Sequence, residues 1–210
     1  MVVMLVGVTL LACTDRSAPS VASPGAEPED GPPTAFQGDV FNDRIAALVQ
    51  RQVDQGLPIT PRGRAFDRCP AVDDGALQAL ADVFEADATA IQDLGATVTD
   101  PDGQPTLSCP LKFGEASAGA AVLTVGPASG DLAEQLAAAN YEEVPDATVA
   151  GLPDEQVRLF DSTQFEASRA VWSADGFQIS LTGNSDLVAS GALLEALPVA
   201  VKEVSRVIGT

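Results

Sequence analysis

Histidine is absent from this 210-residue chain. It is the side chain whose unperturbed pKa lies near neutrality, and both Ser-His-Asp and Cys-His nucleophilic catalysis depend on it. Its absence excludes those mechanisms and His-rich zinc sites, and it leaves any acid–base chemistry to carboxylates. We therefore expect no enzyme, no cofactor and no metal site in this chain.

Basic residues are also scarce: 11 Lys and Arg residues stand against 30 Asp and Glu residues, a formal net charge of −19. A surface of this charge repels phosphate backbones, so we exclude nucleic acid as a partner. The acids concentrate between Cys69 and Val157, where 16 of them stand against Lys112 alone. This stretch is either a solvated acidic exterior or an interaction surface for cations or a basic partner.

Aromatic residues are few, with eight Phe, one Tyr and one Trp. They must first supply the core, so we predict that Trp172 is buried and is no platform for a sugar ring. The adjacent acids Glu142-Glu143 and Asp154-Glu155 are the candidates for a carboxylate-dependent hydrolase. Adjacent acids are more commonly solvated, and we assign no catalytic residue.

The apolar run at the N-terminus, Val2 to Ala12, is too short to span a bilayer and suits the core of a signal peptide. It ends in Leu10-Leu11-Ala12-Cys13, an order that resembles the lipobox of bacterial lipoproteins. In those proteins the Cys thiol is lipidated and becomes the mature N-terminus, a role that the resemblance assigns to Cys13. No Lys or Arg precedes the run, so the alternative of a cytosolic protein with an apolar first strand stays open.

Three regions follow from this assignment. Residues 1–12 are predicted to be a lipoprotein signal peptide, and two acyl chains on Cys13 would anchor the product stably to the membrane. Residues 13–38 contain the lipidated Cys and a spacer rich in Pro, Ala, Ser and Gly, which we predict to be flexible. Residues 39–210 are predicted to be a single globular domain, because a chain with 46% hydrophobic residues can build a core.

Apolar residues at three- and four-residue spacing predict four helices in this domain. They are residues 43–54 with Asn42 as the cap, a helix that starts after Asp73 and ends near Ala86 or continues to Leu94, residues 130–139, and residues 187–208. Because proline lacks an N–H group, Pro198 is expected to kink or divide the last helix.

Period-two alternation predicts strands at residues 96–99, 106–113, 120–125, 156–160 and a hairpin at 170–182. In that hairpin an Asp175-Gly176 turn would place Ala170 and Trp172 opposite Leu181 and Ile179. The order of elements predicts an α+β fold: an antiparallel β-sheet packed against helices on one face, with a long C-terminal helix.

Two details concern the strand 106–113. Pro110 cannot donate to a ladder, which predicts an edge strand or a bulge. The preceding segment, residues 100–103 (Asp-Pro-Asp-Gly), resembles the start of a calcium loop but has no Glu at the twelfth position, so we interpret it as a turn.

Cys69 and Cys109 remain once Cys13 is assigned to lipid, an even number in a chain that we expect to be exported. They predict a disulfide that ties the start of the helix after Asp73 to the sheet. The alternative, a redox-active pair, would need a C-x-x-C spacing and an activating base, and both are missing.

The order of these motifs resembles the actinobacterial lipoproteins catalogued as domain of unknown function 3558. The resemblance covers residues 65–208 and depends on a lipobox Cys, a low-complexity spacer, a Cys-Pro before a Leu-rich helix, a second Cys in a strand, a Gly-Leu-x-Asp-Glu segment at 151–155, a hairpin and a terminal helix. It implies a cell-envelope protein that is loosely similar to extracytoplasmic sensor and ligand-binding domains, and it implies no catalytic residues.

The expected function is therefore that of a membrane-tethered, extracytoplasmic lipoprotein. Its domain would bind a small ligand or a cell-envelope protein without catalysis. Two alternatives stay open, namely a carboxylate-dependent hydrolase of the envelope and a passive structural lipoprotein. A concave apolar pocket would favour binding, and a buried carboxylate pair with raised pKa values would favour the hydrolase.

Overall fold

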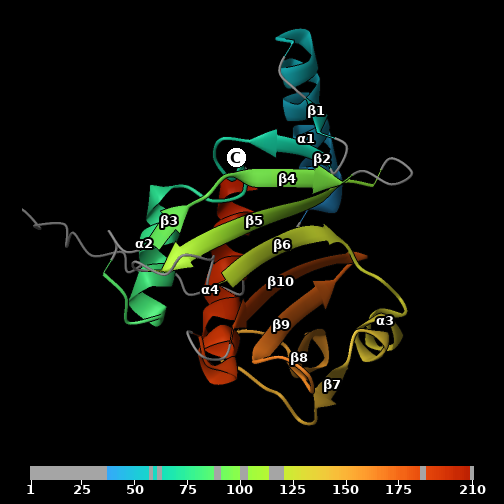
Figure 1. The fold of residues 1–210 in the computed structure, drawn as a ribbon, viewed down its shortest axis with the longest axis vertical. Helices are drawn as coiled ribbons and strands as arrows, with labels where there is room; N and C mark the ends of the chain where they lie inside the picture. Colours follow the sequence, from blue (N-terminus) through green and yellow to red (C-terminus); the bar gives the residue numbers. More distant parts are fainter. Residues whose placement is uncertain are drawn as a thin grey trace, which may run out of the picture. The chain divides into compact units, whose positions relative to one another are not determined.

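An antiparallel sheet organises the computed structural model (Figure 1), which describes residues 37–56, 59–60, 63–87, 91–99, 104–113, 121–184 and 188–208. All of these residues belong to one unit, Gly31–Thr210. The described strands are β1 (Ile59–Thr60), β2 (Gly63–Phe66), β3 (Ile91–Asp93), β4 (Ala96–Thr99), β5 (Thr106–Phe113), β6 (Ala121–Pro127), β7 (Tyr141–Val144), β8 (Val157–Ser162), β9 (Ala167–Ala174) and β10 (Phe177–Asn184).

The strands lie in the order β1-β2-β4-β5-β6-β10-β9-β8-β7, and β3 pairs with β5 beyond the end of β4. Every pairing is antiparallel. The helices are α1 (Gly38–Asp54), α2 (Asp74–Val83), α3 (Leu132–Ala138) and α4 (Ser190–Ile208), with a short 3₁₀ turn, η3 (Asp154–Gln156). The predicted α+β fold, with its antiparallel sheet and long C-terminal helix, is confirmed.

The β9–β10 hairpin forms in the predicted register. Trp172 lies opposite Ile179 and Ala170 lies opposite Leu181, and all four side chains are buried. At the turn Asp175 and Gly176 have φ angles of 50° and 81°. Two positive φ angles are the signature of a type I′ turn, whose twist matches that of the flanking strands.

Pro110 lies in an interior strand, so the predicted edge strand is wrong, and the alternative of a bulge is what the structure contains. On one side of β5, Thr97 pairs with Ser108 and Asp93 pairs with Leu111. Three residues therefore separate the partners in the facing chain while two separate them in β5. This extra residue divides β3 from β4 at the position that faces the missing N–H of Pro110.

One face of the sheet contains the main core. Its side chains from β5, β6, β9 and β10 pack against α1, α2 and α4, and the largest fully buried ones include Leu107, Leu111, Leu123, Ile179, Leu181, Leu193 and Leu197. In Figure 1, α4 lies behind these strands. Arg44 of α1 donates to the carbonyl oxygen of Val207 at 2.5 Å, which places a cation at the C-terminal end of α4.

The third helix, α3, packs on the opposite face, so the prediction that the helices lie on one face is wrong for α3. Leu132 and Leu136 of α3 form a separate cluster with Phe160 and Val171. These two strand residues alternate with Leu159, Ala170 and Trp172 of the main core. Because β8 and β9 are apolar on both faces, a second layer is needed to cover them.

Several predicted helix ends are corrected. Helix α1 begins at Gly38 after Gln37, and Asn42 is an interior residue; the extra turn buries Phe41. Helix α2 ends at Val83 and does not reach Leu94, since Glu85 adopts a φ of 51° and residues 91–93 form β3.

Two other features of the elements differ from the sequence patterns. Helix α4 continues through Pro198 and is not divided, because its buried stripe holds both halves against the sheet. Strands β1, β2, β3 and β7 were not predicted.

Candidate functional site

The disulfide is formed as predicted between Cys69, five residues before α2, and Cys109 in β5. The S–S distance is 2.04 Å and the Cα atoms are 5.5 Å apart. Cys69 is 2% exposed and Cys109 is fully buried. A thiolate that exchanges with an external disulfide must be accessible, so the burial favours a structural bond over a redox-active pair.

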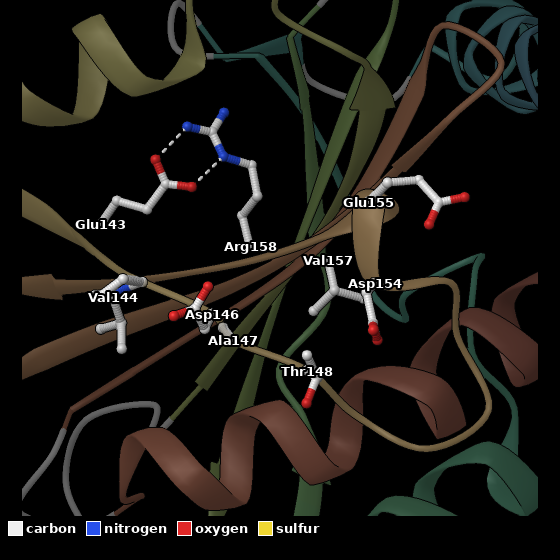
Figure 2. A pocket seen from close by; sticks show the side chains of 10 residues that line it. Glu143, Val144, Asp146, Ala147, Thr148, Asp154, Glu155, Val157 and Arg158 are labelled. Atoms are coloured by element: carbon white, nitrogen blue, oxygen red, sulfur yellow. Dashed lines mark hydrogen bonds and ion pairs between the residues drawn. The ribbon is translucent and has the colours of Figure 1, made fainter.

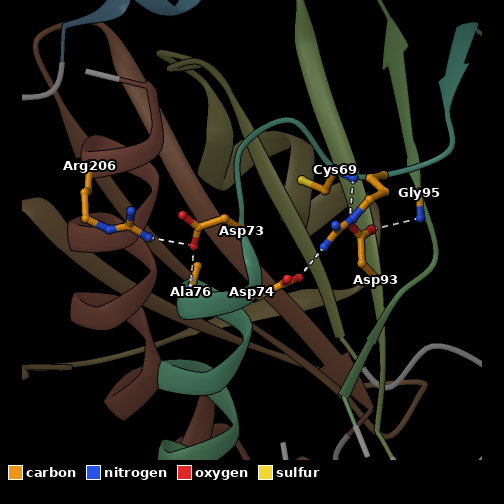
Figure 3. A network of polar contacts seen from close by, with 8 residues as sticks. Cys69, Asp73, Asp74, Ala76, Asp93, Gly95 and Arg206 are labelled. Carbon is orange, nitrogen blue, oxygen red and sulfur yellow. Dashed lines mark hydrogen bonds and ion pairs between the residues drawn. The ribbon is translucent and has the colours of Figure 1, made fainter. Parts of the chain in front are cut away.

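Asp93 holds the backbone on both sides of this bond (Figure 3). Its Oδ2 atom accepts from the backbone N–H of Cys69 at 2.8 Å, and its Oδ1 atom accepts from that of Gly95 at 2.9 Å. The Asp93 side chain is only 5% exposed, whereas Arg68, whose Nε atom lies 3.8 Å from Oδ2, is 62% exposed. A buried carboxylate with two backbone donors fixes the loop that carries Cys69.

A second carboxylate joins α2 to α4. Asp73 is the N-cap of α2, because its Oδ1 atom accepts from the backbone N–H of Ala76 at 2.9 Å. The same atom accepts from Arg206 Nη2 at 2.7 Å (Figure 3). The hydrogen bond from Arg206, followed by that from Ala76, lowers the pKa of Asp73 to about 2. These contacts explain how the start of α2 is held, and they leave no free carboxylate for chemistry there.

The larger of two described hollows lies where β7 and β8 meet η3, and we name it the β7–β8 hollow (Figure 2). It has a volume of about 320 Å³, which is at the lower end of the range for small-molecule sites. The lining contains four acids and one base, and its residues are Glu143, Val144, Pro145, Asp146, Ala147, Thr148, Asp154, Glu155, Val157 and Arg158.

The charges of the hollow are unequal. Arg158 forms a bidentate ion pair with Glu143, at 2.6 Å from Nε and 2.5 Å from Nη2, and its guanidinium lies over the Phe160 ring. The hydrogen bonds from Arg158 lower the pKa of Glu143, and those bonds raise the pKa of Arg158. Glu143 is therefore held in its ionised form, the opposite of what a general acid requires.

Asp154 and Glu155 do not form a carboxylate pair. Both are exposed on η3, and in Figure 2 their side chains point in different directions. Asp146, at a turn with a φ of 55°, and Thr148 complete the polar lining. After the Glu143–Arg158 pair is set aside, three carboxylates remain on the wall, so the hollow suits a ligand that has a positive charge.

The smaller hollow lies between α1 and β4 and has a volume of about 160 Å³. It is lined mainly by apolar side chains of α1 together with Val98 and Pro105, and Asn42 contributes an amide oxygen that has no hydrogen-bond partner. This volume is below that of ordinary small-molecule sites.

The other predicted site residues fall as follows. Trp172 is 5% exposed and donates from Nε1 to Gln156 Oε1 at 2.9 Å, so it is a core residue as predicted. Glu142 is exposed on β7 and does not line the β7–β8 hollow. Cys13 and the predicted turn at residues 100–103 lie outside the described residues.

Comparison with protein-family models, curated proteins and solved structures finds no match to this chain. Within the described ranges, no helix is long and apolar enough to cross a bilayer. The same ranges contain no group of three or more Cys, Asp or Glu side chains arranged to hold a metal ion.

Sequence reasoning missed Asp146, Thr148 and Arg158 in the hollow, and it missed Asp93 beside the disulfide. The contact between Glu143 and Arg158 depends on the register of β7 against β8, and β7 was not predicted. One signal was present, since Arg158 is the only base between Lys112 and Arg169 in a strongly acidic stretch.

Proposed function

We propose that the chain is a membrane-tethered, extracytoplasmic lipoprotein whose domain binds a small ligand or a cell-envelope protein without catalysis. The observation that supports the location is the buried Cys69–Cys109 disulfide, because such bonds persist in oxidising compartments. The Leu10-Leu11-Ala12-Cys13 sequence and the resemblance to domain of unknown function 3558 support the same location. Lipid on Cys13 would anchor the domain on the outer face of the membrane.

The β7–β8 hollow is the binding site that we propose. Its volume of about 320 Å³ is large enough for a small ligand, and its unpaired carboxylates favour one with an amine or guanidine group. The ionised Glu143 and the separate directions of Asp154 and Glu155 favour binding over hydrolysis.

The anchoring part of the proposal is tested by metabolic labelling with a radioactive or clickable fatty acid. The wild-type protein should be labelled and should stay with the membrane, whereas Cys13→Ala should lose both properties. Ser17→Ala, a small change just after the lipobox, is the matched control and should be labelled like the wild type. A Cys13→Ala variant that is still labelled would contradict the anchor.

The binding part is tested by capturing the lipidated protein from its own envelope and identifying bound small molecules and proteins by mass spectrometry. A cationic compound should be enriched with the wild type and lost from Asp146→Asn/Asp154→Asn. Glu134→Gln, which removes an exposed charge from α3 outside the hollow, should retain it. Enrichment that is equal in all three proteins would contradict the hollow as the site, and no enriched molecule would favour a passive structural role.

A further inference from the structure

Five adjacent strands of this acidic protein contain no Asp or Glu. These strands are β4, β5, β6, β10 and β9, which follow one another in the sheet, and their only charged residues are Lys112 and Arg169. Because the chain has 30 acids, an acid-free region of this size defines a surface whose charge differs from that of the rest of the protein.

The side of these strands that faces away from the main core is lined by hydroxyl groups. Ser180, Thr124, Ser108 and Thr97 lie directly opposite one another across β10, β6, β5 and β4. Thr182 begins the neighbouring row and lies opposite Arg169 of β9. We name these five Ser and Thr residues the hydroxyl face. Helix α3 covers Val171 and Phe160, at the β8–β9 end of the same side.

Arg169 stands where the hydroxyl face meets the region covered by α3. It is half-buried, and its Nε atom is inaccessible to solvent and has no hydrogen-bond partner. Its Nη2 atom donates to the Ser180 hydroxyl at 3.1 Å. One of the five N–H groups of the guanidinium thus has an assigned protein acceptor, and that acceptor is neutral.

No carboxylate of the described residues lies within ion-pair distance of Arg169. Arg68, Arg158 and Arg206 all have such partners, at 2.5 to 2.7 Å. Burial lowers the pKa of Arg169, which means that the surroundings disfavour its charge. Burying a cation without an anion costs free energy, and an anionic ligand would remove that cost.

We propose that Arg169, with the hydroxyls of Ser180 and Thr182 beside it, binds a carboxylate or phosphate group of a ligand that lies on the hydroxyl face. A guanidinium presents parallel N–H donors that match the oxygens of either group, and hydroxyls next to it supply further donors. Arg169 is not part of the lining of the β7–β8 hollow. This site therefore depends neither on the lipid anchor nor on the proposed cationic ligand.

Thermal unfolding of the full chain with Cys13→Ala tests the site, with sodium phosphate or sodium acetate added and sodium chloride as the control at equal ionic strength. Phosphate or acetate should raise the midpoint more than chloride, with a saturating dependence on concentration. Arg169→Gln should weaken the apparent affinity at least tenfold and Arg169→Lys should weaken it less. Lys112→Gln removes the same charge from the same side of the sheet and should leave the affinity unchanged. An unchanged affinity in Arg169→Gln would overturn the proposal.

A measurement on the unsubstituted arginine covers the case in which Arg169→Gln does not fold. The ¹⁵Nε resonance of Arg169 should shift on addition of phosphate, while that of the exposed Arg51 stays in place. Equal shifts of both resonances would indicate nonspecific screening and would overturn the site.

Sedimentation with vesicles distinguishes the two sources of phosphate. If the ligand is a lipid headgroup, the Cys13→Ala chain should bind vesicles of phosphatidylglycerol with phosphatidylcholine and not phosphatidylcholine alone, and Arg169→Gln should lose that binding. If the ligand is a free anion, phosphate should stabilise the protein and neither vesicle should bind. Vesicle binding that persists in Arg169→Gln would contradict a role for Arg169 at the membrane.

Discussion

Replacement of Asp93 by Asn should destabilise the protein by about 3 kcal/mol, although it changes one atom. The carboxylate accepts from two backbone N–H groups, those of Cys69 and Gly95, and its side chain is 5% exposed. An amide has one acceptor oxygen, so its NH₂ group would face one of the two donors. That donor would be left buried and unsatisfied, which costs about 1–3 kcal/mol.

The remaining hydrogen bond would also weaken. A hydrogen bond to a charged acceptor contributes about 1.5–3 kcal/mol and a neutral one about 1 kcal/mol, so a further loss of about 1 kcal/mol is expected. The 3.8 Å contact with Arg68 adds little, since that side chain is 62% exposed. Asn avoids part of the cost of burying a charge, which keeps the total near 3 kcal/mol.

Urea unfolding of the two oxidised proteins would measure the difference, with the slope against urea expected to stay the same. Asp74→Asn is the matched control, because Asp74 also contacts Arg68 but its side chain is 87% exposed. It should change the free energy of unfolding by less than about 0.5 kcal/mol. A loss below about 1 kcal/mol in Asp93→Asn, or one equal to that of the control, would refute the role of Asp93 as a double acceptor.

Three further predictions concern the same part of the fold. Replacement of Cys69 and Cys109 by Ala, which removes a link between residues 40 positions apart, should cost about 4 kcal/mol in urea unfolding; a loss below 1 kcal/mol would argue against the loop-entropy account. The pKa of Asp73 is about 2 in the folded protein against an ordinary 3.8, so its stabilising effect is complete above about pH 5 and is lost as the pH falls toward 2. The stability difference between the wild type and Asp73→Asn, which retains a cap, should shrink over that interval, and a constant difference would exclude the charge as its source. Gly95→Ala should cost at least about 2 kcal/mol, because Gly95 has a φ of 90° and a Cβ atom would lie 2.3 Å from a backbone oxygen; Gly130→Ala, which meets no atom within 4 Å, is the control.

Local sequence patterns were sufficient for elements that depend on their own residues. Asp175-Gly176 between alternating apolar residues specified the β9–β10 hairpin and its register, because few dipeptides tolerate two positive φ angles. Asp73 marked the start of α2, since its side chain caps the helix from within the same segment. The Cys69–Cys109 bond followed from counting cysteines in a chain expected to be exported.

Short strands could not be predicted because their stability comes from their neighbours. Strand β7 (Tyr141–Val144) has two adjacent Glu residues and no apolar alternation, and it pairs only along β8. Strand β3 has three residues and follows a helix that the sequence could equally have extended. For such segments the hydrogen bonds and burial that the sheet provides outweigh local propensity.

The sequence by itself determined the class of fold, the disulfide, the principal hairpin and the acidity of the chain, because each depends on composition or on residues near one another. Tertiary structure alone decided that α3 covers the second face of the sheet, that Asp93 holds the two sides of the loop at Cys69, and that Arg158 has a carboxylate partner whereas Arg169 has none. These features depend on strand register, which brings residues together from distant parts of the chain, and a single sequence does not contain that pairing explicitly.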